Sequence, residues 1–296
     1  MSESLLLREQ EWFEPLLLRV RHLTRYVYHG PVIDSFNEAR LQPVSDTSQE
    51  CLEFHLRIDP PTTRVRDYPD LHSNCVHYFD VPQSHTMLEV ESTSLIQTHP
   101  DTRILFPAAC SPSALKNKSA MENYFDFLSD SEYVSLSMEV WKETVDVLPN
   151  GLTDLWQDSV AIGGHIYNTF TYTPKFTTVN THPLDVLTSR RGVCQDFAHL
   201  MLGMCRTQGI PARYVSGYFY NPNRMPDEIE ASHAWVEVYL PEYGWKGFDP
   251  THNRVPDTRY IKLAVGRDYG DIRPVSGTFR GTGTRELIVE VQITRA

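Results

Sequence analysis

The sequence predicts an α+β fold in two parts: an N-terminal antiparallel β-sheet or sandwich, and a C-terminal part in which a cysteine-bearing helix packs on an antiparallel sheet. Two observations carry this prediction. Residues 16–105 contain runs such as "CLEFHLRID", in which apolar and polar side chains alternate with the period of a half-buried strand. Residues 194–208 carry an apolar stripe at helical spacing, and strand-like runs follow them. A run of strands followed by a helix and further strands is typical of α+β proteins.

The first predicted domain spans residues 16–105 and is rich in β-branched and aromatic residues. The run "LLLRVRHLTRYVYHG" stops at Gly30-Pro31, and "TMLEVESTSLI" alternates apolar and polar side chains. Prolines separate the strands, as expected because proline cannot donate to a strand ladder. Residues 106–150 are more polar, and we expect them to form a connecting segment of loops and short helices.

The third segment, residues 151–296, is predicted to hold the functional core together with the C-terminal strand segment. A helix is expected from about Thr153, which can cap it, to Asn168. A second helix begins at Cys194 and is closed by Gly209. The runs "ARYVSGYFY", "HAWVEVYL", "GWKGFDPT" and "RELIVEVQITR" are predicted to be strands.

Composition narrows the function before any motif is considered. The 296 residues carry a net charge of −11, which argues against a nucleic-acid partner because such a partner needs a basic face. The first residues lack the pattern of a secretory signal, and no run reaches the roughly 18 apolar residues of a membrane span. We therefore expect a cytoplasmic protein with no membrane partner. Its five cysteines, odd in number and scattered, are expected to be free thiols.

Cys194 is the residue with the clearest chemical potential. As the first residue of a predicted helix it lies among unpaired backbone N–H groups at the positive end of the helix dipole. Both features favour a thiolate, and the same N–H groups can hold an oxyanion. Cys205 lies roughly 16 Å further along the helix, too far for a disulfide. We therefore expect Cys205 to be a core residue.

A thiolate nucleophile needs a base and a group that orients the base. Both are available in "SHAWVEVYLPEYGWKGFDPTHN", where His233 opens one predicted strand and Asp249 ends the next. Opposed residues of a hairpin have position numbers with a constant sum, and these two residues share a face only if that sum is even. An even sum requires a loop of three or five residues, or a compensating bulge. A four-residue loop without a bulge would separate the two side chains.

Structural interpretations of these residues compete with the catalytic one. A single cysteine at a helix start is more often a packing residue, and a histidine at a strand start is usually satisfied by local bonds. The conjunction of three such residues at element ends makes catalysis as well supported as packing, and both interpretations stay open at this point. A zinc site at His72, Cys75 and His77 lacks an evident fourth ligand and a standard spacing, so no metal or other cofactor is expected.

Three blocks in order, "GVCQDFAHL", "GIPARYVSGY" and "ASHAWVEVYLPEYGWKGFDPT", closely resemble the bacterial transglutaminase-like family, which is grouped with the papain-like cysteine enzymes. The runs "LRVRHLTRYVYHGPV" and "GRDYGDIRPVSGTFRG" resemble the β-rich N-terminal region and the C-terminal segment found with this family. The resemblance implies a papain-like core with Cys194 as nucleophile, His233 as general base and acid, and Asp249 as the group that orients the imidazole. The family commonly has "DPTN" where this chain has "DPTHN", so His252 departs from the pattern close to Asp249.

The implied reaction is attack of the Cys194 thiolate on a carboxamide or peptide carbonyl, giving a thioester that a second nucleophile resolves. Water would make the protein a protease or amidase acting on peptides or proteins, which is the favoured expectation. An amine such as lysine would make it a transglutaminase. The Cys194 backbone N–H would hold the oxyanion, with Tyr172 as a candidate second donor. The alternative of another class is a non-catalytic binding or scaffold module, and the oligomeric state is left open.

Overall fold

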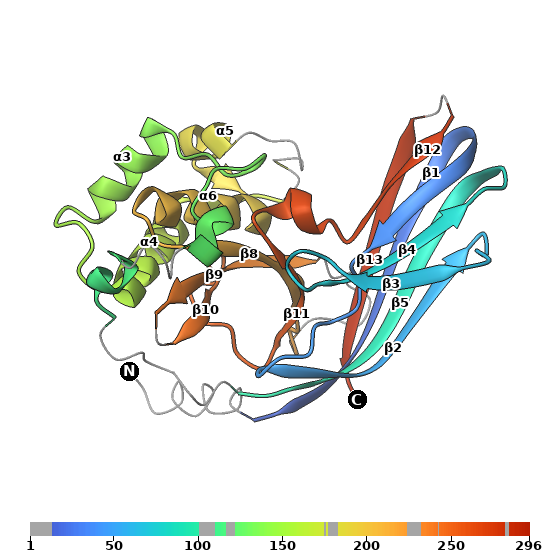
Figure 1. Cartoon of the computed structure of the whole chain (residues 1–296), viewed down its shortest axis with the longest axis horizontal. Helices are drawn as coiled ribbons and strands as arrows, with labels where there is room; N and C mark the ends of the chain where they lie inside the picture. Colours follow the sequence, from blue (N-terminus) through green and yellow to red (C-terminus); the bar gives the residue numbers. More distant parts are fainter. Residues whose placement is uncertain are drawn as a thin grey trace.

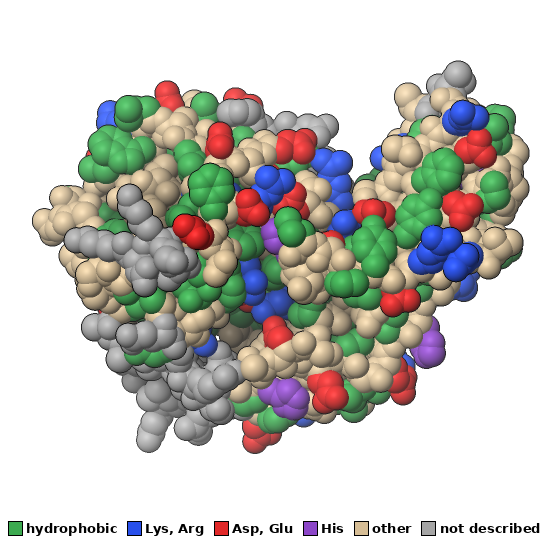
Figure 2. Space-filling view, viewed as in Figure 1, with side chains coloured by type: hydrophobic (Ala, Val, Ile, Leu, Met, Phe, Trp, Pro, Cys, Tyr) green, Lys and Arg blue, Asp and Glu red, His purple; other side chains and the backbone are tan. Residues whose placement is uncertain are grey.

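The computed structural model describes residues 14–100, 110–116, 122–174, 176, 183–223, 232–241, 243–281 and 284–296. Figure 1 shows two parts: a long curled sheet, and a smaller sheet covered by helices. The predicted α+β class is confirmed. Figure 2 shows a hollow between the two parts, with side chains of both charges along its walls. None of the helices in the described ranges combines the length and apolar character needed to cross a bilayer.

The long sheet is antiparallel and is built around one 24-residue strand, β1 (Leu16–Ala39). The first half of β1 pairs with β5 and β13, and its second half pairs with β4 and β12. The other strands of this sheet are β2 (Gln49–Asp59), β3 (Val65–Pro69), β4 (Cys75–Val81), β5 (His85–Thr98), β12 (Val275–Arg280) and β13 (Arg285–Arg295). Because β1 bends, the sheet curls over its own apolar core, which includes Tyr26, Phe79 and Leu88.

The end of the chain completes the N-terminal sheet, which corrects the predicted domain boundary. β13 pairs with β1 from Leu18 opposite Arg295 to Tyr28 opposite Arg285, and β12 pairs with β1 further along. The C-terminal strand segment therefore does not belong to the sheet of the 151–296 segment. Alternating side chains predict a strand but not its partner, since the hydrogen bonds of a strand edge are the same for near and distant segments.

The second sheet has four antiparallel strands in the order β10 (Gly244–Phe248), β9 (His233–Leu240), β8 (Ala212–Phe219) and β11 (Tyr260–Gly266). Helices α3 (Met138–Val147), α4 (Leu155–Thr169), α5 (Pro183–Ser189) and α6 (Cys194–Thr207) gather on one side of it (Figure 1). Short elements are η2 (Pro112–Lys116), η3 (Glu122–Phe127), η4 (Tyr269–Ile272) and the two-residue strands β6 (Thr171–Tyr172) and β7 (Arg191–Gly192). The buried stripe of α6, including Ala198 and Met201, joins the strand residue Val236 in one core.

The cap of helix α4 lies one residue later than the sequence predicts. Asp154, not Thr153, is the N-cap, because its carboxylate accepts from the backbone N–H groups of residues 156 and 157. Thr153 instead donates its own N–H to Asp158 at 2.6 Å. Gly163 in this helix has a packing reason, since a Cβ there would collide with the Phe248 ring. The glycine thus lets the end of β10 approach the helix layer.

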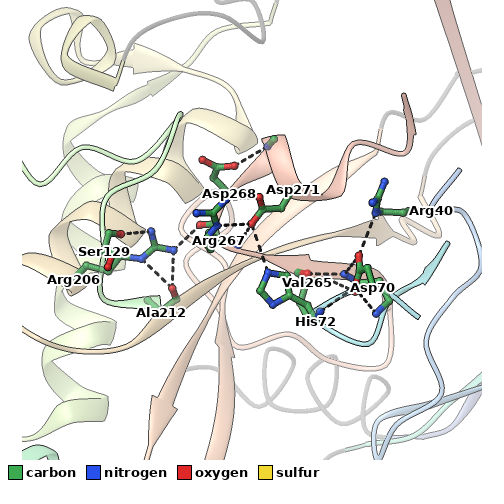
Figure 3. A network of polar contacts seen from close by, with 12 residues as sticks. Arg40, Asp70, His72, Ser129, Arg206, Ala212, Val265, Arg267, Asp268 and Asp271 are labelled. Atoms are coloured by element: carbon green, nitrogen blue, oxygen red, sulfur yellow. Dashed lines mark hydrogen bonds and ion pairs between the residues drawn. The ribbon is translucent and has the colours of Figure 1, made fainter. Parts of the chain in front are cut away.

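A polar network joins the two sheets (Figure 3). Asn74, in the turn between β3 and β4, donates to the carbonyl of Val265 and accepts from its N–H, both at 2.8 Å. Asp271 accepts from Arg267 at 2.9 Å and lies 3.6 Å from the His72 ring. These bonds fix the turn of the long sheet against the last residues of β11.

On the helix side of this network, Arg206 of α6 donates to three backbone carbonyls. They belong to Ser129 at 2.8 Å, Ala212 at 2.9 Å and Arg267 at 2.5 Å. A buried guanidinium is tolerated only when its donors are bonded in this way. Arg206 therefore anchors η4 and the start of β8 to the helix.

Candidate active site

Cys194 lies at the N-terminus of α6, as the sequence predicts, and 8% of its surface is exposed. The N-cap is Val193, which has no side-chain oxygen to bond the N–H groups of the first turn. Instead the Asp196 carboxylate turns back and accepts from the Val193 N–H at 2.8 Å. A Cβ on Gly192 would lie 2.8 Å from the Cβ of Asp196, so this turn requires glycine. The backbone N–H groups of the first turn therefore lie at Cys194 without a side-chain cap from Val193.

The β9–β10 hairpin meets the geometric condition that the sequence left open. Gly244 lies opposite Leu240 and Phe248 lies opposite Val236, so the sum of paired positions is even. The strands are separated by residues 241–243, and Gly244 has a positive φ of 73°. This three-residue loop places His233 and Asp249 on the same face. Their side chains meet, with Nε2 of His233 2.8 Å from Oδ2 of Asp249.

His233 connects the cysteine to the aspartate. Its Nε2 is bonded to Asp249, so Nδ1 is the ring nitrogen left for its side-chain hydrogen bond with Cys194. Burial alone would lower the pKa of His233, but the charge of Asp249, the hydrogen bond to it and the contact with Cys194 raise this pKa to about 10. The imidazolium form is therefore favoured at neutral pH, next to the Cys194 thiol.

Asp249 is fully buried, with 0% of its surface exposed. Three side chains donate to its Oδ2: His233 at 2.8 Å, His252 Nδ1 at 2.7 Å and the Tyr260 hydroxyl at 2.7 Å. The backbone N–H of Thr251 donates to Oδ1 at 2.8 Å. Burial opposes ionisation, but the charges and hydrogen bonds of His233 and His252 lower the pKa of Asp249 far below its ordinary value. The carboxylate is therefore ionised throughout the physiological range.

Tyr260 and His252 are the contacts that sequence reasoning did not assign. His252 was visible as a departure from the family pattern, but nothing in its position indicated a bond to Asp249. Tyr260 begins β11, and no local signal pairs it with a residue on another strand. Burial, followed by the charge of Asp249, raises its pKa well above the ordinary value, so its hydroxyl keeps the proton that it donates.

Tyr172 lies beside the start of α6, and its proposed role as an oxyanion donor stays a prediction. Strand β6 pairs in parallel with β7, which puts Tyr172 opposite Gly192. Its ring lies edge-on to Phe197, with 6.3 Å between centroids, and 49% of the residue is exposed. Tyr172 therefore lies close to the cysteine end of the helix.

The three residues considered for zinc have separate partners. The His77 ring packs on Phe54, and the Cys75 thiol donates to Gln42. His72 packs on Phe127 and faces Asp271. In the parts of the chain that the structure describes, these residues do not form a ligand cluster.

The described residues do bring three ligand-type atoms together at His233, Asp249 and His252, within 4.8 Å of one another. These atoms already bond to each other, because both rings donate to the same carboxylate oxygen. A metal ion could bind there only by displacing both of those hydrogen bonds. The arrangement is therefore that of an oriented acid–base pair beside a thiol.

Comparison with known proteins identifies the family of the chain. Residues 145–250 match the model of the transglutaminase-like superfamily, and residues 18–97 match that of the bacterial transglutaminase-like N-terminal region. An uncharacterized protein of Mycobacterium leprae is 36% identical over 284 residues, which cover 94% of this chain and 98% of that protein. A protein-glutamine gamma-glutamyltransferase of Pseudomonas aeruginosa is 37% identical over 95 residues, or 30% of this chain and 14% of that one.

Among solved structures, one described as a candidate cysteine protease from Cytophaga hutchinsonii aligns with a TM-score of 0.75. The alignment covers 95% of this chain and 91% of that one, at 23% identity. This likeness shows that the whole two-part fold is shared. The chain therefore belongs to the transglutaminase-like superfamily and carries the bacterial N-terminal region of that family.

Proposed function

We propose that the protein is a cysteine-dependent acyl-transfer enzyme that acts on peptide or carboxamide bonds, with Cys194 as nucleophile, His233 as general base and acid, and Asp249 as the group that orients the imidazole. The observation that carries the proposal is the unbroken chain of contacts from thiol to imidazole to buried carboxylate at a helix N-terminus. A structural cysteine does not require an imidazole held by an ionised carboxylate.

In the acylation step, the Cys194 thiolate attacks the carbonyl carbon and the negative charge moves to the carbonyl oxygen. The Cys194 backbone N–H, at a helix start without a side-chain cap, is the first donor for this oxyanion. The His233 imidazolium then gives its proton to the leaving amine while the C–N bond breaks. The product is a thioester on Cys194 and a neutral imidazole.

In the deacylation step, neutral His233 takes a proton from the incoming nucleophile, which attacks the thioester carbon. Collapse of the second tetrahedral intermediate breaks the C–S bond and restores the thiolate–imidazolium pair. We favour water as this nucleophile, which makes the protein a protease or amidase. Transfer to an amine is the second candidate, supported by the local likeness to the Pseudomonas aeruginosa transferase.

The test is a thioester-trapping experiment with the full chain. A peptide pool that contains glutamine and lysine is incubated with the wild-type protein and with Cys194→Ala, with and without an added primary amine. Mass spectrometry then distinguishes cleaved or deamidated peptide, which indicates hydrolysis, from incorporated amine, which indicates transfer. Both activities should vanish in Cys194→Ala.

A second measurement separates an enzyme from a binding module. At pH 6, iodoacetamide should label Cys194 well before the other cysteines, because a thiolate reacts and a thiol does not. Cys205 should be slow, since burial raises its pKa to about 12. Equal labelling of all five cysteines, with no change in the peptide pool, would reject the enzyme and leave the scaffold function.

A further inference from the structure

Oδ2 of Asp249 is an unusual acceptor, because three side chains from three different segments donate to it. His233 comes from β9, His252 from the turn after β10, and Tyr260 from β11. A carboxylate offers about four lone-pair positions over its two oxygens, so three donors on one oxygen exceed the ordinary share. The fold thus concentrates bonds on the one atom that orients the proposed base.

We infer that Tyr260 and His252 are positioning residues that share the charge of Asp249 with His233, and so both fix the imidazole and limit how strongly it holds its proton. The catalytic meaning of this inference rests on the proposed function, but the contact itself can be tested without turnover. Each hydrogen bond that a carboxylate accepts leaves less of its negative charge to act on its other partners. Two competing donors therefore leave less charge to stabilise the His233 imidazolium.

The groups around His233 make this effect separable from other charges. Cys194 faces the ring from α6, and Asp249, His252 and Tyr260 face it from the other side. Among the described residues, strands β8 and β9 place the uncharged rings of Phe219 and Trp235 beside His233.

The Arg259 guanidinium lies over the Phe219 ring and is paired with Asp257. Among the described residues, Asp249 and Cys194 provide the charge and hydrogen bonds that raise the pKa of His233, and Tyr260 and His252 donate to that same carboxylate.

The two residues can be changed without opening the core. Tyr260→Phe removes one hydroxyl and keeps a ring that packs on Trp235 at 5.4 Å and on Phe219 at 4.9 Å. His252 has 34% of its side chain exposed, so His252→Ala leaves no buried cavity. His252→Asn keeps a short side chain with an N–H donor. Tyr218→Phe is the matched control, because the Tyr218 hydroxyl is equally buried but bonds His22 at 2.8 Å.

The experiment is an NMR titration of the His233 ring nitrogens in the full chain. Tyr260→Phe and His252→Ala should move the titration midpoint of His233 upward by about 0.5–1 pH unit, since more of the Asp249 charge then acts on His233. His252→Asn should lie closer to wild type than His252→Ala does. Tyr218→Phe should leave the midpoint unchanged.

An unchanged or lowered midpoint in both Tyr260→Phe and His252→Ala would overturn the inference, whatever their thermal stability. The pH dependence of the Cys194 alkylation rate is a second measurement. The change in this rate at high pH should move by the same amount as the His233 titration midpoint. Loss of peptide turnover in Cys194→Ala tests the proposed function separately. An inactive wild type with shifted midpoints would reject the function and keep the inference.

Discussion

Strand β11 joins two buried polar clusters of opposite character. At its first residue, the triad cluster gathers Cys194, His233, Asp249, His252 and Tyr260. At its last residues, the Arg206 cluster gathers Asn74, His199, Arg206, Asp268 and Asp271. Figure 3 shows Arg206, Asp268 and Asp271 of this cluster. Helix α6 runs between the two clusters, with Cys194 at one end and Arg206 near the other.

The two clusters shift the same residue type in opposite directions. His233 faces an ionised carboxylate, which raises its pKa to about 10 against the effect of burial. His199 is stacked between Tyr133 and Tyr214, and burial lowers its pKa to about 4. Its Nε2 accepts a backbone N–H from Tyr269, a bond that only the neutral ring can make. One histidine is therefore prepared to carry a proton, and the other is kept from doing so.

The two clusters differ in where their hydrogen bonds end: on backbone groups in one, and on a side chain proposed to react in the other. In the Arg206 cluster the guanidinium donates to backbone carbonyls, and the Asn74 amide bonds both the carbonyl and the N–H of Val265. In the triad cluster the bonds instead lead to the thiol of Cys194, the proposed nucleophile, at a helix start. Four measurements test this contrast.

The largest effect is expected from the two cysteines of α6. Cys194→Ala should lower peptide turnover by about 10³-fold or more, because no other group can form the thioester. Cys205→Ala, at the fully buried position three turns away, should cost about 1–2 kcal/mol of stability through lost packing. Its turnover per folded molecule should match wild type. Equal losses of turnover in the two variants would contradict the assignment of the nucleophile.

The second effect concerns one carboxylate from each cluster. Asp249→Asn should lower turnover by about 10²–10⁴-fold, because it removes the charge that keeps His233 protonated and oriented. Asp271→Asn should leave turnover unchanged, although it also removes a carboxylate whose pKa the neighbouring His72 and Arg267 hold low. Steady-state kinetics on the peptide found by thioester trapping measures both. A full-rate Asp249→Asn would break the proposed triad.

The third effect is on stability. Asn74→Ala should lower the free energy of unfolding by about 2–3 kcal/mol, since it leaves the N–H and carbonyl of Val265 buried without their partners. Chemical denaturation measures this loss, and Asn123→Ala at an exposed position of η3 is the control. Turnover per folded molecule should stay at the wild-type value. A large loss of turnover would show that the Arg206 cluster also shapes the active site.

The smallest effect is the pH dependence that His199 imposes. Its folded-state pKa is lowered to about 4, so the unfolded chain binds the proton first as pH falls below 6.5. Lowering the pH from 7 to 5 should therefore cost about 2 kcal/mol through this residue. His233 acts in the opposite sense: its pKa is raised, so its contribution is complete below pH 6.5 and is lost only as pH rises toward 10.

His199→Gln isolates this contribution, because glutamine can still accept the Tyr269 N–H but does not titrate. His22 is also buried, with its pKa lowered to about 4, and stays in both proteins. The difference in unfolding free energy between pH 7 and pH 5 should be smaller in the variant than in wild type. Identical differences would show that His199 is protonated in the folded protein.

Much of the fold could be predicted because its signals are local. Helix α6 follows from an apolar stripe closed by Gly209, and the structure gives that residue a positive φ of 77°. The β9–β10 hairpin follows from two alternating runs, and its even register was stated as the condition for His233 and Asp249 to meet. The cap of α4 was misplaced by one residue, because Thr153 and Asp154 are both good caps and the bond to Asp158 decides between them.

The sequence by itself determined the α+β class, the family, and the three residues proposed to carry the chemistry, because periodicity and ordered motifs are written in neighbouring residues. Only the tertiary structure decided that β13 closes the N-terminal sheet, that Asn74 bonds Val265, and that Tyr260 and His252 join His233 on one oxygen of Asp249. The reason is physical. Strand partners and buried hydrogen bonds depend on which distant segments are brought together, and no local pattern records that choice.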